Sequence, residues 1–416
     1  MEIVKVNLQE LNNYVLTSNK PHFMQTGAWG EVNKKRGSKA HYLLIKDNNT
    51  VIGSAMLLEK KVLKYSTFYC PRGFITDFDN KDNIKTITEL LTKYVKDNNG
   101  LYLKIDPDII IRKLNSNAEP IEEYKNKIEL VDYLKSLGYK HRGFTVRLNE
   151  TSAPRFTFRV DVTKDDLLES FHQTTRNLLK RNNPYNLKIY VGNENDLDKF
   201  YLPMKETAIR KKMYLEDISY FSNFYKELKK YDMADLYLVS VNIDDLKNTY
   251  NSMIENTKEE LKSLENSNKK GKINDLNDQL VKYNKELKQI NEINEKELIL
   301  SSMINAKFGD YVWTIHGANS NKLSFLNANY EMYYQILKDA KKDGYKYVDF
   351  YGTEGVIDKS SEVYGIYNFK VRFGGDFDEF IGEFDYITSP SMYNIIMSLL
   401  KIRRRIKYRI QLLKNK

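Results

Sequence analysis

Two cations near the end of the chain have types and spacing that could do chemistry. Lys370 and Arg372 alternate with Phe369, Val371 and Phe373 in the segment "NFKVRFGG". In a strand, successive side chains point to opposite faces, so the two cations would share one face and the three apolar residues the other. Such a cationic face could hold a negative charge that develops during a reaction. An ordinary strand with one core face and one solvated face would show the same alternation.

Composition limits the other kinds of site that this chain could carry. Cys70 is the single cysteine, so no intramolecular disulfide can form, and no HExxH or CxxC spacing accompanies the five histidines. We therefore expect no transition-metal site. The sequence shows no secretory signal and no apolar run of about eighteen residues, which predicts a cytoplasmic protein.

Length and charge indicate the elements that must position a site and the partners it could meet. A chain of 416 residues exceeds one ordinary core, so we expect two domains with an appendage. The net charge of +10 favours a polyanionic partner such as nucleic acid, phosphates or an anionic membrane. The tail Lys401–Lys416 has eight Lys/Arg and no acid, and as a helix it carries one apolar stripe: Ile402, Ile406, Ile410 and Leu413. This pattern fits an interfacial helix at anionic lipid and, equally, a helix docked on the protein through the stripe.

A helical arm is predicted from Asp244 to about Leu300. The segment contains no proline, and its second half repeats apolar residues at steps of three and four: Ile273, Leu276, Leu280, Tyr283, Leu287 and Ile290. The polar stretch Asn266–Lys272, "NSNKKGK", predicts a turn between two long antiparallel helices. Such an arm could reach a large partner such as tRNA, or it could stabilise or dimerise the protein.

Without the arm, the chain shows an internal repeat. "GSAMLLEKKV" leads through a helix-period segment into "LYLKIDPDI", and "LSSMINAKF" leads through another into "YKYVDFYG". Each half predicts a strand hairpin, a loop, an amphipathic helix that ends near Gly100 or Gly344, and a strand ending in polar residues. A duplicated α+β domain accounts for both halves.

Five segments, in this order and spacing, resemble the FemABX aminoacyltransferases: "QTGAWGEVNKKRG", "LYLKIDPD", "TTRNLLKRNN", "DFYGTEG" and "NFKVRFGG". The resemblance covers nearly the whole chain, and the arm is similar to that of the FemA, FemB and MurM-type members. Those enzymes build the peptide cross-bridge or branch of peptidoglycan and use aminoacyl-tRNA as the donor.

The resemblance implies an α+β fold of two acetyltransferase-like (GNAT-like) domains with the antiparallel coiled-coil arm inserted in the second. The first domain would span 1–155, and the C-terminal segment, about 380–416, would return to it. The second would span 156–243 and 301–379, and the arm 244–300. This organisation agrees with the internal repeat.

The resemblance also implies a reaction without a cofactor. The stem-peptide lysine, or an existing bridge residue, would attack the ester of a charged tRNA and receive Gly, Ser or Ala. Because the ester is already activated, the enzyme must align amine and ester and stabilise the tetrahedral oxyanion. Lys370 matches the lysine of the family's "FK" motif, so we expect it to hold that charge or the end of the tRNA. Arg372 would help to keep the site positive.

The acceptor, lipid II or UDP-MurNAc-pentapeptide, carries a pyrophosphate that the family binds with two cations. Arg210 in "ETAIRKKMY" matches the family's second-domain arginine, and a planar guanidinium can bind phosphate through two hydrogen bonds. The other cation is a lysine after the tryptophan of the first motif. Our register puts Asn33 at that position, so the neighbouring Lys34 is the candidate. A solvated helix face is the alternative for both cations.

Four further residues match positions that border the peptide site of the family. Tyr102 and Asp106 match the family's "Y..(K/R).DP" strand end. Asp106 could orient the attacking ammonium or accept its proton, although Asp before Pro is also a common turn residue. His316 in "WTIHGANS" stands where relatives carry a tyrosine, and Tyr351 ends the second-domain strand as Tyr102 borders the first.

Three cations in "TTRNLLKRNN" complete the predicted site. Arg176, Lys180 and Arg181 have helical spacing, so one basic face could meet tRNA phosphates, or the segment could simply be an exposed helix start. We therefore predict a cytoplasmic aminoacyltransferase that acts on lipid II and contacts the inner face of the membrane through its basic tail. The alternatives are a non-catalytic tRNA-binding relative and an acyl-CoA N-acyltransferase, although the chain lacks the glycine-rich pyrophosphate loop of the latter.

Overall fold

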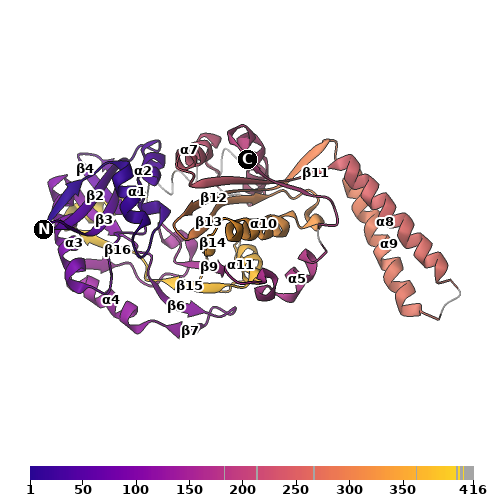
Figure 1. Cartoon of the computed structure of the whole chain (residues 1–416). Helices are drawn as coiled ribbons and strands as arrows, with labels where there is room; N and C mark the ends of the chain where they lie inside the picture. Colours follow the sequence, from indigo (N-terminus) through magenta and orange to yellow (C-terminus); the bar gives the residue numbers. More distant parts are fainter. Residues whose placement is uncertain are drawn as a thin grey trace.

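Two bodies built on β-sheets lie side by side, and a helical arm projects from the second (Figure 1). The computed structural model describes residues 1–181, 183–211, 214–265, 268–361, 363–399, 402 and 406. Within these residues the strands form one seven-stranded and one nine-stranded sheet, and helices flank both. The mixed α+β class expected from the sequence is therefore confirmed.

The first sheet has the strand order β1-β2-β3-β4-β5-β16-β8. The strand bounds are β1 Glu2–Lys5, β2 Lys39–Asp47, β3 Thr50–Val62, β4 Tyr65–Cys70, β5 Gly100–Ile105, β16 Phe384–Ile387 and β8 Tyr139–His141. Its helices are α1 Leu8–Leu16, α2 Gly27–Lys34, α3 Lys81–Asp97 and α4 Lys125–Ser136. Helix α3 begins where the Asn80 side chain accepts the Asn83 backbone N–H, and it buries Ile87 and Leu91 against the sheet.

The second sheet has the strand order β10-β11-β12-β13-β14-β9-β15-β6-β7. Its bounds are β10 Lys188–Gly192, β11 Ala234–Asn242, β12 Glu297–Phe308, β13 Tyr311–Asn319, β14 Tyr347–Thr353, β9 Phe156–Asp161, β15 Asp376–Phe380, β6 Ile110–Leu114 and β7 Pro120–Glu123. Its helices are α5 Gln173–Leu179, α6 Leu197–Arg210, α7 Ile218–Lys229, α10 Ala328–Lys342 and α11 Tyr364–Lys370. Met332 and Ile336 of α10 are buried in the core of this sheet.

Each sheet contains the same supersecondary unit. In the first, β3 and β4 are antiparallel, and α3 then leads to β5, which is parallel to β4. In the second, β12 and β13 are antiparallel, and α10 leads to β14, which is parallel to β13. This common order and pairing is the internal repeat expected from the sequence.

The arm consists of α8 Ile243–Ser263 and α9 Lys270–Asn291, inserted between β11 and β12 (Figure 1). At its base Tyr250 is fully buried, stacks on Tyr185 and donates to Glu286 of α9 at 3.0 Å. The expected arm end at residue 300 is wrong, because residues 297–300 already belong to β12. There a run of consecutive buried apolar residues pairs with β11, for example Leu298 with Val241.

Each sheet contains strands from the part of the sequence that mainly forms the other sheet. Strand β16, near the C-terminus, lies between β5 and β8 of the first sheet. Strands β6 and β7 come before residue 155, yet they belong to the second sheet, because β6 pairs with β15. The predicted first domain, 1–155, therefore contains two strands of the second sheet. The domain boundary at residue 155 stays a prediction.

A C-terminal helix packs on the first sheet. Residues 390–399 and the described residues 402 and 406 are helical. Tyr393 and Ile396 are buried against the start of β5, whereas a stripe on the other side is about half exposed: Ile395, Leu399, Ile402 and Ile406. The alternative that the helix docks on the protein through its apolar stripe is therefore wrong for Ile402 and Ile406, which are exposed. The rest of Lys401–Lys416 lies outside the described residues. No helix formed by the described residues is long and apolar enough to cross a membrane.

Candidate active site

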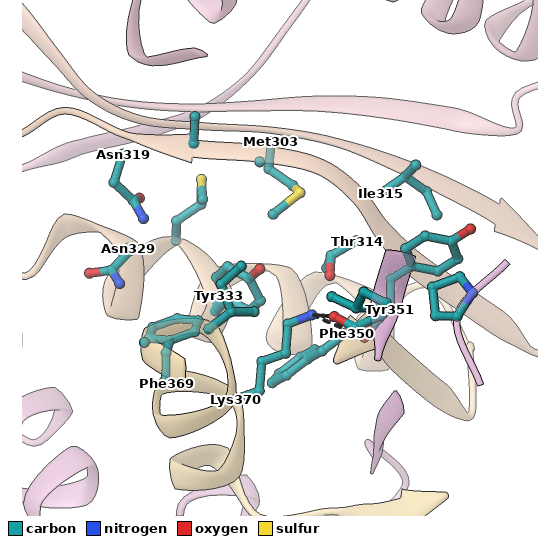
Figure 2. Close-up of a pocket in the computed structure, with 18 of the residues that line it drawn as sticks. Met303, Thr314, Ile315, Asn319, Asn329, Tyr333, Phe350, Tyr351, Phe369 and Lys370 are labelled. Atoms are coloured by element: carbon teal, nitrogen blue, oxygen red, sulfur yellow. Dashed lines mark hydrogen bonds between the residues drawn. The ribbon is translucent and has the colours of Figure 1, made fainter. Parts of the chain in front are cut away.

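A cavity of about 490 Å³ opens in the second body between β13 and β14 (Figure 2). The two strands pair in parallel only as far as Trp313 and Asp349, and the residues beyond this pair line the cavity. Helices α10 and α11 supply further lining side chains, including Tyr333 and Phe369. The site therefore lies where two parallel strands separate, a place at which main-chain groups become accessible to a ligand.

The corresponding place in the first sheet is filled by the protein itself. Strands β4 and β5 pair as far as Cys70 and Ile105. Just beyond, the Arg72 backbone N–H donates to Asp106 Oδ1 at 2.7 Å, and Gln25 donates to the Pro71 carbonyl at 2.6 Å. The two halves of the repeat thus differ at this point, and the cavity with Lys370 belongs to the second.

The segment "NFKVRFGG" is helical, so the expected strand is wrong. Helix α11 ends at Lys370, and a single 3-10 turn, Val371–Phe373, follows it. Phe369 and Phe373 are four residues apart and both pack on Tyr333, which fits a helical turn. Over so short a segment, alternation cannot separate a strand from a helix whose aromatic residues recur at this spacing.

Lys370 lies in the wall of the cavity with its ammonium held by main-chain carbonyls (Figure 2). Its Nζ donates to the Tyr351 carbonyl at 3.0 Å and to the Gly352 carbonyl at 2.7 Å. Burial lowers the pKa of Lys370 to about 7, and the negative charge of Asp349 opposes this shift. Two carbonyl contacts leave one N–H of the ammonium for an oxygen atom in the cavity.

Gly352 is required by the close packing of this wall. A Cβ built on Gly352 would lie 2.5 Å from Pro154 Cγ, which leaves no room for a larger residue. The motif "FYG" therefore serves the backbone geometry of the site, because the Gly352 carbonyl is one of the two acceptors of Lys370.

A group of buried charges joins the two bodies behind the cavity. The Arg159 guanidinium donates from Nε to Asp349 at 2.9 Å and from Nη2 to both oxygens of Asp108 at 3.1 Å. Asp378 Oδ2 lies 3.8 Å from the same Nε. The neighbouring cations hold the pKa of Asp108 well below its usual range, even though burial alone would raise it. Asp108 lies in the connection between β5 of the first sheet and β6 of the second, and Asp349 lies on β14, so Arg159 fixes this connection to β14.

Three predicted site residues line the cavity. Lys370 and Tyr351 lie in its wall, and Arg210, at the end of α6, lies at its edge with Lys211 beside it. Arg210 is exposed, and its Nη2 lies 3.4 Å from the Thr207 hydroxyl. Arg372 does not line the cavity. It belongs to the 3-10 turn after α11, so it does not share a strand face with Lys370.

Asp106 lies outside the cavity that contains Lys370. Its carboxylate accepts the Arg72 backbone N–H and, at 2.9 Å, the Tyr69 hydroxyl. Burial raises the pKa of Asp106 to about 7, although the Arg72 charge opposes this shift. Burial raises the pKa of Tyr351, and the Asp106 charge adds to this shift. Tyr351 lines the cavity and also a small neighbouring cavity that Arg72 lines.

Three other predicted residues do not line the cavity. Lys34, at the end of α2, forms an ion pair with Glu31 at 2.7 Å and is partly exposed. Tyr102 packs edge-on against Tyr393 of the C-terminal helix. His316 is on β13 between two cavity-lining residues, but its Nε2 lies 3.1 Å from a tyrosine hydroxyl of α7. Burial lowers the pKa of His316 to about 3, so this ring is neutral at physiological pH.

The cations predicted to meet tRNA lie on α5 and directly after its end. Arg176 contacts the carbonyl of Phe171, whereas Lys180 and Arg181 are exposed. Arg181 and Lys282 of the arm line the same small cavity of about 50 Å³. The basic segment therefore lies at the base of the arm.

Sequence reasoning missed the buried polar residues behind the cavity. Arg159 and Thr157 lie in "FTFRVD" and Asp349 lies in "YVDFYG", both of which are otherwise apolar strands. A charge inside a strand that is buried on both faces must be paired, and this could have marked Arg159 and Asp349. Among the described residues, no group of His, Cys, Asp and Glu is arranged to hold a metal ion.

Several known proteins are similar to this chain over nearly its whole length. The FemAB family model matches residues 6–401. The chain is 29% identical to "Lipid II:glycine glycyltransferase" of Staphylococcus epidermidis over 427 residues, which covers 98% of this chain and 100% of the relative. It is 30% identical over 433 residues to the protein of the same name from Staphylococcus aureus, with the same coverage. The solved structure "Crystal structure of FemX" is 28% identical, has a TM-score of 0.76, and covers 95% of this chain and 100% of that chain.

Proposed function

Because the chain belongs to the FemAB family and is an aminoacyltransferase, we propose that it adds glycine to lipid II and so forms the peptidoglycan bridge. The names of the two staphylococcal relatives support both the acceptor and the amino acid. We further propose aminoacyl-tRNA as the donor, on the resemblance of the motifs around Lys370 and of the arm to aminoacyl-tRNA-dependent enzymes.

The observation that carries the chemistry is the Lys370 ammonium in the wall of the cavity. The acceptor amine attacks the ester carbonyl, and a tetrahedral intermediate with one negative oxygen forms. The remaining N–H of Lys370 is available to donate to that oxygen. The attack forms the new C–N bond; the intermediate then collapses, which restores the carbonyl and breaks the ester C–O bond, and the terminal ribose hydroxyl of the tRNA leaves.

The proton of the attacking amine needs an acceptor, and Asp106 is our candidate. Burial gives its carboxyl a pKa of about 7, which suits proton transfer near neutral pH. It lies outside the cavity, and Arg72, whose backbone N–H donates to it, lines a small neighbouring cavity together with Tyr351, so the amine would approach Asp106 from the side of Tyr351. Lys370 and Asp106 would then act from opposite bodies on one reaction centre.

Phosphate recognition is proposed for Arg210 at the edge of the cavity. Its exposed guanidinium can take a pyrophosphate through two hydrogen bonds without breaking an ion pair found among the described residues. Lys34, Tyr102 and His316 lie elsewhere, and we assign them no contact with substrate. Arg176, Lys180 and Arg181 are proposed to meet tRNA phosphates near the base of the arm.

Membrane contact is proposed for the C-terminal helix. One of its faces packs on β5 through Tyr393 and Ile396, and the opposite face exposes the apolar stripe that includes Ile395 and Ile402. The sequence that follows is strongly basic, so the stripe and its cations suit an anionic lipid surface. An acceptor anchored in the membrane would be reached from that surface.

Mass spectrometry of the acceptor tests the proposal most directly. Purified protein is incubated with lipid II, with the soluble UDP-linked pentapeptide and with a mixture of charged tRNAs. We expect lipid II to gain the mass of one glycine residue, and no gain when acetyl-CoA replaces the tRNAs. A gain of serine or alanine would revise the amino acid, and a gain on the soluble precursor alone would revise the acceptor. No gain on either acceptor would overturn the proposed function.

A further inference from the structure

The carbonyls that hold Lys370 come from an irregular part of β14. The pairing of β14 with β9 is interrupted between Asp349 and Gly352. Within this interruption Tyr351 has a φ of 57°, in the left-handed region that residues other than glycine rarely adopt. The irregular segment turns the Tyr351 and Gly352 carbonyls toward Lys370. A strained conformation of this kind persists only when neighbouring contacts determine it.

Two side chains behind the strand hold the strained segment. The Asp349 carboxylate accepts the Tyr351 backbone N–H at 2.7 Å. The Thr157 hydroxyl, on β9, donates to the same carboxylate and lies 3.1 Å from the Tyr351 carbonyl. Thr157 and Asp349 are both 2% exposed, so water does not compete for these contacts.

Arg159 holds Asp349 in turn. Its Nε donates to the second oxygen of Asp349 at 2.9 Å, while its Nη2 donates to Asp108 in the connection between β5 and β6. The guanidinium also lies over the rings of Tyr311 and Phe380. The carboxylate of Asp349 is therefore fixed on both oxygens and cannot rotate without breaking several contacts.

We propose that Thr157, Arg159 and Asp349 are positioning residues, which hold the irregular segment of β14 and through it place the Lys370 ammonium in the cavity. They act through Tyr351 and Gly352 and do not themselves donate to a substrate. This inference rests on the proposed function, because it assigns these residues to the same reaction.

The charge of Asp349 also acts on Lys370 directly. It opposes the fall in pKa that burial causes, while Arg210 and Lys211 line the same cavity from the end of α6. Loss of the Asp349 charge therefore lowers the Lys370 pKa further, and the protonated form is lost at a lower pH.

The test compares two matched pairs of variants. Thr157→Val removes the hydroxyl at nearly constant volume, and Thr157→Ser keeps the hydroxyl but removes a methyl group. Asp349→Asn removes the charge that holds the segment. Asp378→Asn is its control, because Asp378 is equally buried beside Arg159 and makes no hydrogen bond to Tyr351 or Gly352 among the described contacts.

Two readouts are needed. The first is kcat, KM and the pH profile of amino-acid transfer. The second is the pH dependence of Lys370 acetylation by acetic anhydride, followed by peptide mass spectrometry, which needs neither donor nor acceptor. Melting temperatures confirm that each variant is folded.

We expect Thr157→Val and Asp349→Asn to lower kcat by roughly 10- to 100-fold, since a displacement of about 1 Å can cost that much, with KM changed little. Thr157→Ser should restore kcat, and Lys370 should be acetylated at lower pH in Asp349→Asn than in Asp378→Asn. Wild-type kcat and labelling in folded Thr157→Val and Asp349→Asn would overturn the inference. An equal shift in the pH dependence of Lys370 acetylation in Asp378→Asn would overturn it too. The shift would then arise from the loss of any buried negative charge near Arg159, not from the contacts of Asp349. If wild-type protein transfers no amino acid, the proposed function fails, while the labelling still tests the placement of Lys370.

Discussion

Replacement of Lys370 by methionine should abolish most of the activity and leave the protein folded. In the wild type, the drop in pKa from 10.5 to about 7 means that the folded protein loses roughly 5 kcal/mol by holding this ammonium charged below pH 7. That cost disappears as the pH rises toward 10.5. Lys370→Met removes the cost, but it leaves two buried carbonyls without a donor, at about 1–3 kcal/mol each. The two effects are of similar size, so we expect little net change in stability at pH 6.

The effect on the reaction should be much larger. Removal of one donor to an oxyanion typically lowers kcat by about 10²- to 10³-fold, or ~3–4 kcal/mol. The assay is single-turnover transfer to lipid II, with the melting temperature measured on the same preparation. Lys338→Met is the matched control, because Lys338 lies exposed on α10 and outside the cavity. If folded Lys370→Met kept more than about a third of the wild-type rate, an oxyanion role for Lys370 would be refuted.

Three further predictions follow from particular contacts. The protonated form of Lys370 is lost as the pH rises through about 7, so kcat should fall there, and the pH profile of Lys370→Met should lack this fall. Replacement of both Ile395 and Ile402 by serine should weaken binding to anionic vesicles by roughly 10-fold or more, since each exposed side chain would bury apolar area in the lipid. Leu16→Ser, at an equally exposed leucine elsewhere, should bind the vesicles as the wild type does, and equal binding by all three proteins would contradict the membrane contact. Tyr250→Phe should lower the free energy of unfolding by about 1 kcal/mol in urea titrations, because the hydrogen bond to the second arm helix is lost; an unchanged value would show that this bond contributes nothing.

Elements with a long local pattern were predicted well from the sequence. The heptad spacing that includes Leu276 and Ile290 recurs over many turns, so the arm could be identified without knowledge of its neighbours. The strand, helix and strand of each repeat likewise have their own apolar periodicity, which is why the α+β class could be derived.

Short segments and boundaries were predicted less well. "NFKVRFGG" was expected to be a strand, because two residues per period fit its alternation. Packing of Phe369 and Phe373 on α10 instead makes it a helical turn. Strand β6 follows the first repeat in sequence but pairs with β15, and β7 pairs with β6. No local pattern indicates a partner that is more than 250 residues away, as for Leu114 and Phe377.

The sequence by itself determined the types of side chain that can do the chemistry: its alternating pattern marked Lys370 and its resemblance to the family marked Arg210, and the structure places both at one cavity. Only the tertiary structure decided how Lys370 is held, because its two acceptors are carbonyls of a strained strand segment that buried Thr157 and Asp349 stabilise. Every residue has a main-chain carbonyl, so the residue types in a sequence do not show which carbonyl will accept a hydrogen bond. The pKa of an ammonium depends on burial and on charges contributed by distant segments, so it too arises only when the chain is folded.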